Sequence, residues 1–235
     1  MNKKIIEILL KDRTTGKNII WATGNNPEDE IFPAQINLIE PRYKKNSAQQ
    51  KLRARKKAEI FTPYKICKRQ NDLIDDENIE STVLEITCGE APYLVSRYDV
   101  VTGEPIPFDE RTGILDRKLR RVGKIATAKT NWLTLAEKAV QSVYGYEFQG
   151  DNLFLARQNI FLTYVEYYEK IFADEIEDTI LERIAEIISW NLWQMDGLTN
   201  TPPFVEPNNG NLFDNVTLCR IRDWKKCSTE IFSLN

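Results

Sequence analysis

Two short segments carry features that could hold a small polar ligand. The apolar run 83–87 leads directly into Gly89, and the run 143–146 ends at Glu147. A glycine directly after a strand lets a ligand approach the backbone closely. In doubly wound parallel sheets, ligands bind beyond the carboxyl ends of the strands, and an acid after the second strand binds ribose hydroxyl groups. The two segments therefore predict a nucleotide-like ligand at one edge of a parallel sheet.

The elements that must position these residues follow a strand and helix alternation. The two runs are short and apolar, which is typical of buried strands. The stretches 150–172 and 175–190 have apolar residues at helical spacing, and Asn131 is expected to cap another helix before the second run. Thr62 before Pro63 predicts a helix start, because threonine caps and proline suits the first helical position. Strands separated by helices predict an α/β fold with parallel strands.

The composition excludes several classes of protein. The chain has 235 residues and no histidine, which removes the usual general base and every Ser-His or Cys-His nucleophile. Its four cysteines form no CxxC pair, so we expect reduced thiols and no metal site. No apolar run is long enough to cross a membrane, and we predict a cytoplasmic protein without a membrane partner. Residues 1–40 predict a small extended or mixed piece.

Two segments concentrate positive charge, although the formal net charge is only −3. The run 42–57 contains eight Lys and Arg residues and no acid, and a second basic run covers 116–124. Each run is either a solvated helix face or linker, or a surface that contacts nucleic-acid phosphates. The lack of acids in the first run adds some support to phosphate contact, because solvated helices usually mix charges of both signs. The residues expected to bind DNA are Lys51, Arg53, Arg55, Lys56, Lys57, Arg117, Lys118, Arg120 and Arg121.

Three successive motifs resemble those of a known family. They are EIFTP at 59–63, LEITCGEAPYLVSRYD at 84–99 and VYGYEFQGDNLFLARQNI at 143–160, and NLWQMDGL at 191–198 is similar to the motif that follows. Together they resemble the motifs of DNA N6-adenine methyltransferases, most closely the modification subunits of restriction–modification systems. The resemblance extends over roughly residues 55–200.

The resemblance implies a site for S-adenosylmethionine. The residues that match the family's cofactor motifs are Phe61, Thr62 and Pro63 beside the methionine part, Cys88, Gly89 and Glu90 in the loop, Glu147 at the ribose, and Asp196 at the adenine. One departure is that Ala91 stands where the family usually has a second glycine. It is followed by Pro92, which has no N–H.

The resemblance also implies a fold and a division of the chain. We expect a Rossmann-like class I methyltransferase sheet with helices on both faces. Residues 1–57 would form an N-terminal extension with a basic arm, and residues 58–235 the methyltransferase-like domain. The span between the first two strands is longer than a single helix needs, so an insertion is expected at about 97–130.

The family's catalytic motif is an asparagine or aspartate followed by two prolines and an aromatic residue. The chain offers NTPPF, in which Asn200, Pro202, Pro203 and Phe204 would be catalytic, with one extra residue after the asparagine. The alternative is a proline loop that packs a phenylalanine. The final run 216–224 could instead be a fourth strand of the sheet. The acid and the aromatic ring at its end, Asp223 and Trp224, would then be catalytic rather than a surface acid and a packed indole.

Two functions of different class follow from these patterns. The first is an S-adenosylmethionine-dependent, adenine-specific DNA methyltransferase, with double-stranded DNA as substrate and a restriction or specificity subunit as a further partner. The second is a catalytically inactive methyltransferase-like module that binds DNA or a restriction partner. Cofactor motifs do not name the acceptor, so methylation of RNA or protein stays open as a third possibility.

Overall fold

The computed structural model describes residues 1–57, 59–74, 78–205 and 217–232. Its centre is a parallel sheet of β1 (Val83–Glu85), β2 (Val143–Glu147) and β3 (Leu192–Gln194), in the order β1-β2-β3. The first two strands are those that the apolar runs predict. Because all three strands are parallel, their carboxyl ends lie at one edge of the sheet.

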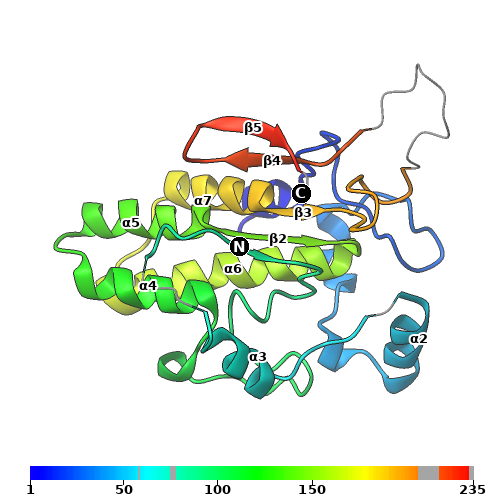
Figure 1. Ribbon diagram of the computed structural model, residues 1–235, viewed down its shortest axis with the longest axis horizontal. Coiled ribbons are helices and arrows are strands. Elements are labelled where there is room, and N and C mark those ends of the chain that lie inside the picture. The colour runs from blue at the N-terminus through cyan, green and yellow to red at the C-terminus, as the bar shows by residue number, and fades with distance from the viewer. Residues whose placement is uncertain (58, 75–77, 206–216, 233–235) are drawn as a thin grey trace.

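Helices make both crossovers between these strands. The first crossover contains α4 (Ile114–Ile125) and α5 (Lys129–Gln141), and the second contains α6 (Gly150–Phe172) and α7 (Asp178–Asn191) (Figure 1). Right-handed crossovers between strands added in one direction place their helices on the same face of the sheet. Within the segment expected as an insertion, α4 buries Leu115, Leu119 and Val122 in the core.

The two faces of the sheet are covered by different elements. Val83, Val143 and Leu192 pack in one large cluster with side chains of the four crossover helices. On the other face, the aromatic residues Tyr146 and Trp193 pack in a second cluster, whose other described members come from the strands, from Met195 after β3 and from the hairpin with its flanking residues. Within the described residues, the hairpin region thus packs on this second face, and helices on both faces of a Rossmann-like sheet stay a prediction.

This hairpin consists of β4 (Arg220–Asp223) and β5 (Ser228–Ile231), which pair antiparallel. The final run was expected as a possible fourth strand of the parallel sheet, and the structure corrects that expectation. The reason is local: the Asp223 carboxylate accepts the N–H groups of Lys225 at 2.9 Å and Lys226 at 3.0 Å. These bonds close a tight turn, so the neighbouring segment pairs with β4 first.

The N-terminal residues form α1 (Lys3–Leu10), and isolated bridges follow between Lys11 and Asn18 and between Ile20 and Glu30. This part of the chain is therefore mixed, one of the two alternatives that the sequence suggests. Asn2 caps this helix by accepting the Ile5 N–H at 2.9 Å. Its buried side chains include Ile5 and Leu9, which join the large core cluster. Helical spacing places Glu7 on the exposed side of this helix.

Arg157 on α6 joins α1 to the end of α7 and the start of β3. Its guanidinium is fully buried and donates to the backbone carbonyls of Leu9 at 2.6 Å, Lys11 at 3.0 Å, Ser189 at 3.2 Å and Leu192 at 2.6 Å. Burial lowers the pKa of this side chain to about 9. The cation is stabilised by backbone carbonyl dipoles and by the negative charge of Asp12, which is how this buried charge is accommodated.

Short helices connect these parts. Residues 33–57 contain η1 (Pro33–Leu38), η2 (Arg42–Lys44) and α2 (Ser47–Lys57), whereas η3 (Phe108–Glu110) precedes α4. Two helix starts differ from prediction by a small shift. The N-cap of α3 (Tyr64–Asn71) is Pro63 rather than Thr62, and α5 begins at Lys129, two residues before Asn131.

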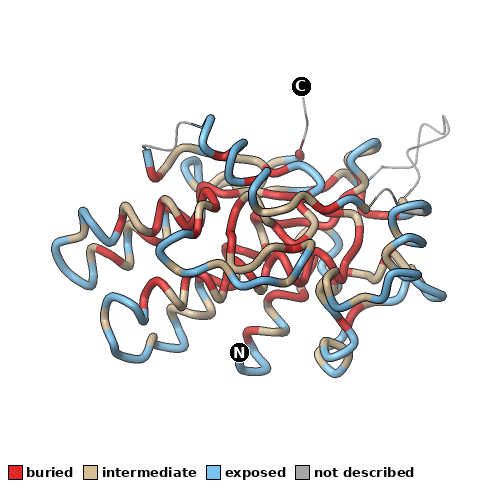
Figure 2. Tube along the Cα trace, turned by 90° about the horizontal axis from the view of Figure 1, so that it is seen from below, coloured by how far each residue is buried: buried red, intermediate tan, exposed pale blue. Residues whose placement is uncertain are grey.

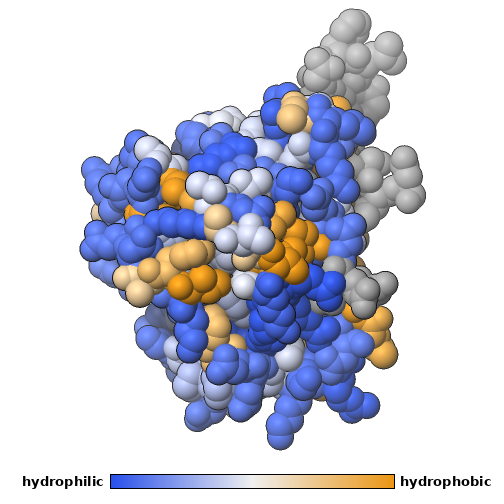
Figure 3. All heavy atoms as spheres, turned by 90° about the vertical axis from the view of Figure 1, so that its left-hand side faces the viewer, coloured by the Kyte–Doolittle hydropathy of each residue, from blue (hydrophilic) through white to orange (hydrophobic). Residues whose placement is uncertain are grey.

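Burial follows this architecture. Figure 2 shows buried chain through the centre of the molecule and exposed chain at its ends. The end that carries the α4–α5 connection has a mostly hydrophilic surface with a few apolar patches (Figure 3). No helix in the described part of the chain combines the length and the apolar character needed to span a bilayer.

Candidate functional site

A cavity of about 440 Å³ lies at the carboxyl ends of β1 and β2. Three segments that are distant in sequence supply most of its wall: 59–62 before α3, 85–89 from the last residue of β1 onward, and 147–149 from the last residue of β2 onward. Pro92, Tyr93 and Asn152 complete the lining. Its volume is within the range of pockets for small molecules and cofactors. The cavity therefore lies where parallel α/β sheets bind ligands.

The loop after β1 meets the acid after β2 inside this cavity. Gly89 has φ +54° and donates its N–H to the Glu147 carboxylate at 2.9 Å. The other carboxylate oxygen accepts the Gln149 N–H at 3.0 Å. A Cβ at position 89 would lie 3.4 Å from the Phe61 ring. The structure thus brings together Phe61, Gly89 and Glu147, which the sequence predicts as one site.

Ala91 also has a backbone conformation that favours glycine, with φ +61°. It stands where the related family usually has glycine, so the loop keeps the left-handed conformation despite the methyl group. The Ala91 side chain is fully buried, and its N–H donates to the Cys88 carbonyl at 2.7 Å. This compact turn shows how alanine is accommodated at that position.

Glu85 is a cavity residue that sequence reasoning missed. It lies at the end of β1 and is 9% exposed, and its Oε2 has no hydrogen-bond partner among the described residues. Burial raises the pKa of Glu85 to about 8, and the neighbouring Glu147 carboxylate adds to the shift. An acid inside an apolar run suggests the solvent-facing side of a strand. The signal that could have found it is its place four residues before Gly89, at the end of the strand.

Two further groups give the cavity its electrostatic character. Burial raises the pKa of Glu147 to about 7, against the opposing effect of its two backbone hydrogen bonds. The Oε1 atom of buried Gln149 has no hydrogen-bond partner among the described residues. Buried acceptors without partners carry a free-energy cost. A ligand that presents hydroxyl or ammonium donors would relieve this cost at both Glu85 and Gln149.

Cys88 and Glu90 flank Gly89 but differ in their positions. Cys88 lines the cavity as a buried thiol whose pKa is raised well above the usual value by burial, so it is not a thiolate nucleophile. Glu90 does not line the cavity. Its carboxylate accepts the Arg42 N–H at 2.7 Å and the Tyr98 hydroxyl at 2.6 Å, which anchors the loop from behind.

The predicted catalytic segment follows β3 as a tight loop. Asp196 accepts the Asn200 N–H through its backbone carbonyl at 2.9 Å, and its own N–H donates to the Thr201 carbonyl at 2.8 Å. Pro202 and Pro203 are buried. The aromatic residue of the motif, Phe204, is half-exposed and packs against Phe148, with ring centroids 5.6 Å apart.

Because Phe148 lines the cavity, this contact brings the aromatic ring of NTPPF to its border. Asn200 and Asp196 are half-buried and do not line the cavity. Asn200 has φ +58°, and its Oδ1 atom is buried without a partner among the described residues. Thr62 lines the cavity, whereas Pro63 begins the turn into α3 beside it.

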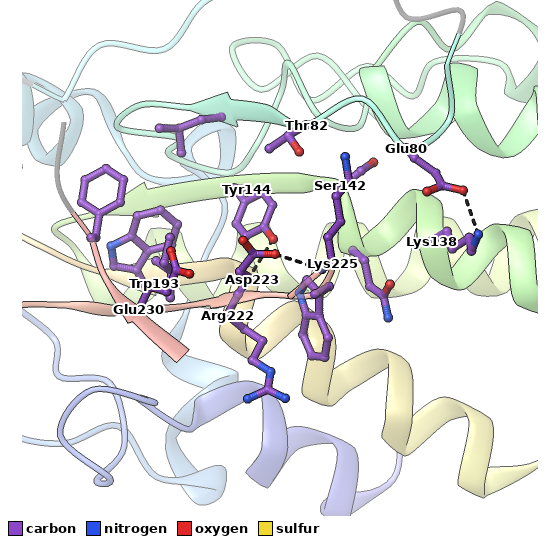
Figure 4. Close-up of a pocket in the computed structure, with 15 residues that line it drawn as sticks. Glu80, Thr82, Lys138, Ser142, Tyr144, Trp193, Arg222, Asp223, Lys225 and Glu230 are labelled. Carbon is purple, nitrogen blue, oxygen red and sulfur yellow. Dashed lines mark hydrogen bonds and ion pairs between the residues drawn. The ribbon is translucent and has the colours of Figure 1, made fainter. Parts of the chain in front are cut away.

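Asp223 and Trp224 lie elsewhere. They border a cavity of about 580 Å³ between β1, β2 and the hairpin, together with Tyr144 and Trp193 (Figure 4). The Trp224 indole donates to the Asn191 side chain at 2.6 Å, and the Tyr144 hydroxyl donates to the Arg222 carbonyl at 2.9 Å. This cavity shares no lining residue with the one at Gly89. The structure does not bring the alternative catalytic pair to the predicted cofactor loop.

The first basic run divides into inward and outward cations. Arg53 is almost enclosed and contacts Asp151 and Glu59. Lys51 and Arg55 on the same helix are exposed. Lys56 and Lys57 end α2, but their side chains lie outside the part that the structure describes. Among these described side chains, Lys51 and Arg55 therefore lie on the surface, whereas Arg53 points inward.

The second basic run supports the fold of α4. Lys118 is fully buried and donates to the Ser142 hydroxyl at 2.6 Å. Arg117 donates to the Asn71 carbonyl at 3.0 Å at the end of α3, and Arg120 donates to the Arg111 carbonyl at 2.8 Å. Arg117, Arg120 and Arg121 nevertheless border a surface groove of about 480 Å³ with Lys124. Arg117 and Arg120 therefore hydrogen-bond to the backbone and also line the surface groove.

These features define a parallel α/β protein with a cofactor-sized cavity at the strand ends. Residues 44–227 match the model of the N-6 DNA methylase family, and the chain belongs to this family. No curated protein and no solved structure matches the chain significantly. Within the described residues, no group of three or more Cys, Asp or Glu side chains is arranged to hold a metal ion.

Proposed function

We propose that the protein is an S-adenosylmethionine-dependent DNA methyltransferase that modifies adenine N6, as the modification component of a restriction–modification system. The observation that supports it best is the meeting of Phe61, Gly89 and Glu147 at one cavity in a chain of the N-6 DNA methylase family. Membership of this family supports an adenine methyltransferase activity with DNA as the substrate. A restriction or specificity subunit is the further partner that this role requires.

The cavity fits the cofactor by its chemistry. Glu85 and Gln149 leave buried acceptor atoms without partners, and S-adenosylmethionine presents ammonium and hydroxyl donors. Each oxygen of Glu147 already accepts one backbone N–H and has a second lone pair for a ribose hydroxyl. When bound, the cofactor supplies the methyl group that is transferred.

The remaining cofactor residues take roles according to their positions. Phe61 and Thr62 form the wall beside the methionine part, with Pro63 fixing the turn into α3. Cys88 and Gly89 offer the backbone of the loop, and Glu90 anchors that loop through Tyr98 rather than contacting the ligand. Asp196 remains our proposal for the adenine of the cofactor, and it requires the loop after β3 to move toward the cavity.

The loop 200–204 is our proposal for the site of the target base. In this role the Asn200 side chain and a backbone carbonyl accept the two hydrogens of the adenine amino group, and the Phe204 ring stacks on the flipped base. Hydrogen bonds of this kind orient the amine and stabilise the charge that develops on it, so no strong general base is needed. The half-exposed Phe204 beside Phe148 supports this assignment.

For DNA contact, we propose the outward cations of the basic runs. Lys51 and Arg55 project from α2, whose C-terminus leads into the cavity wall at 59–62. Lys56, Lys57 and the groove of Arg117, Arg120 and Arg121 complete the proposed phosphate-binding set. Arg53 and Lys118 are partnered inside the protein, so we leave them out of it.

The test combines cofactor titration with methyl transfer. We expect S-adenosylmethionine to bind in calorimetry, and labelled methyl groups to enter double-stranded DNA at adenine. Asn200→Ala is expected to abolish incorporation while cofactor binding persists, and Asp223→Ala serves as the matched control that leaves incorporation unchanged. Absence of cofactor binding by the intact protein would reject the proposal. Incorporation lost in Asp223→Ala but not in Asn200→Ala would reject the site and keep the enzyme class.

One observation supports the second candidate, an inactive module that binds DNA or a restriction partner. Asn200 does not line the cavity, its φ of +58° lies in the left-handed region, and one extra residue separates it from the two prolines. Cofactor binding without incorporation into DNA, RNA or protein substrates would favour this candidate. Parallel assays on matched DNA and RNA duplexes at two salt concentrations identify the acceptor in either case.

A further inference from the structure

The wall of the cofactor cavity is held from outside by a network of four buried charges. Arg53 of α2 donates through Nε to Glu59, and its two Nη atoms donate to the Asp151 carboxylate at 2.8 and 3.0 Å. Lys45 also donates to Asp151, at 3.2 Å. The side chains are 6–12% exposed. Two cations and two carboxylates balance one another, which makes their burial tolerable.

This network joins the N-terminal segment to two parts of the cavity lining. Glu59 lines the cavity at the start of the segment that contains Phe61, and Asn152 lines it from α6. The Arg53 guanidinium reaches both, because Nη2 is also 3.4 Å from the Asn152 side-chain oxygen. The hydrogen bonds of the Arg53 guanidinium therefore fix the position of segment 59–62 relative to the start of α6.

The other side of the network is also hollow. Lys45, Arg53 and Asp151 border a separate cavity of about 520 Å³, which shares no lining residue with the cofactor cavity. The four charged side chains therefore lie between the two cavities, beside segment 59–62. A second cation from the same region also contacts this segment, since the Arg42 guanidinium lies 5.4 Å from the centre of the Phe61 ring.

We propose that Arg53 is a positioning residue for the cofactor cavity, holding segment 59–62 in its binding geometry by bridging Glu59 and Asp151. It acts through Glu59 and does not itself contact the ligand. The assignment rests on the proposed function, because it takes S-adenosylmethionine as the ligand. Only arginine can make the bidentate contact with Asp151 while it holds a second acid.

The charge balance agrees with this role. Burial by itself would lower the pKa of Arg53, but Asp151 and Glu59 outweigh burial and raise it. Burial would raise the pKa of Asp151, yet Lys45 and Arg53 lower it below the usual value. Both shifts favour the charged forms, so the Arg53–Asp151 pair is ionised across the working pH range.

The experiment compares Arg53→Met and Arg53→Lys with Arg220→Met, an exposed arginine on β4 that serves as a matched control. Calorimetry on each folded variant gives the Kd for S-adenosylmethionine. We expect Arg53→Met to raise Kd at least about tenfold, Arg53→Lys to raise it less, and Arg220→Met to leave it unchanged, because displaced binding groups weaken ligand contacts steeply. A Kd for Arg53→Met equal to that of the control overturns the proposal, even if the melting temperature falls.

A double-mutant cycle shows whether Arg53 acts through Glu59. If it does, Arg53→Met combined with Glu59→Gln raises Kd no more than the larger single effect, whereas independent roles give multiplied effects and overturn the proposal.

A readout without cofactor separates this inference from the proposed function. Hydrogen exchange of the ligand-free protein should speed up at 59–62 in Arg53→Met, while β2 keeps its protection. If the wild type binds no S-adenosylmethionine, the proposed function fails, and faster exchange at 59–62 still supports the positioning role. Unchanged exchange at 59–62 overturns it.

Discussion

The two cavities on the parallel sheet differ in what their walls leave unsatisfied. The larger one, under the hairpin, has a lining in which no described residue carries a buried polar side-chain atom without a partner. The smaller one, at the strand ends, contains two such atoms, on Glu85 and Gln149. Volume alone would favour the hairpin cavity as the binding site. The unmet hydrogen-bonding capacity indicates the other, because a protein retains costly buried acceptors where a ligand completes them.

The two cavities should differ most in how the acid of each, Glu147 or Asp223, affects ligand binding. Glu147→Gln should weaken S-adenosylmethionine binding by about 100-fold, because the charged acceptor is lost while the bond to the Gly89 N–H can persist. Asp223→Asn in the hairpin cavity should change Kd by less than about twofold, because a substitution at a distant site without shared contacts has little effect on the binding site. Calorimetry at pH 7.5 checks both. Equal effects of the two substitutions would contradict the assignment of the cavities.

Glu85 should make stability depend on pH in a way that the hairpin cavity does not. Its pKa is raised from 4.5 to about 8, so its contribution to stability is fully present below 4.5 and is lost as pH rises through about 8. Between pH 5 and 9, the free energy of unfolding should therefore fall more steeply in the wild type than in Glu85→Gln.

Asp223 provides the control for this pH series. Its backbone and side-chain hydrogen bonds to Lys226 lower its pKa, so it is ionised throughout that range. Asp223→Asn should leave the slope of stability against pH unchanged. Urea unfolding at a series of pH values measures all three proteins, and a wild-type slope equal to that of Glu85→Gln would show that Glu85 is not the group responsible.

The hairpin cavity should respond as a structural feature. Trp224→Phe removes the donor to the Asn191 side chain and should lower the free energy of unfolding by about 1 kcal/mol, the usual net contribution of a hydrogen bond. Cofactor affinity should not change. Chemical denaturation and calorimetry on the same preparation test the two parts. A Kd that rises together with the loss of stability would show that the two cavities are coupled.

The smallest effect is expected at the rim of that cavity. Lys138 and Glu80 form an ion pair of 2.8 Å between largely exposed side chains. Lys138→Met should change the free energy of unfolding by less than about 0.5 kcal/mol, because solvent screens such pairs. A change above 1 kcal/mol would mean that the rim is more important for the hairpin contact than its exposure suggests.

Sequence reasoning found the parts of the fold that depend on local pattern. β1, β2, α6 and the stripe of α7 follow from apolar spacing. Gly89 and Glu147 follow from their places at strand ends, and Phe61 follows from the resemblance to the family's motif before a helix. What it missed depends on contacts across the chain. It could not place Lys118 in the core, because a buried lysine has the same sequence signal as a surface one until Ser142 is known to lie beside it.

The second face of the sheet shows the same limit. The run 216–224 has the composition of a strand, but its sequence does not indicate whether this strand pairs with β1 or with the segment that follows it. The structure resolves this in favour of the nearest partner, since a hairpin costs less chain entropy to close than a distant pairing. Glu85 was missed for a related reason: an acid in a strand looks solvent-facing unless the opposite wall of the cavity is known.

Arg157 has a consequence for the order in which the chain is completed. Its hydrogen bonds join Leu9 and Lys11 to Ser189 and Leu192, and the first of these spans 148 residues. The carbonyl groups at the end of α1 gain this donor only when α6 is in place, and the guanidinium gains its full set of acceptors only when β3 is in place as well. Removing α1 would therefore leave a buried cation with half of its acceptor carbonyls. These bonds join parts of the chain that are far apart in sequence, and contacts of this kind form late in folding.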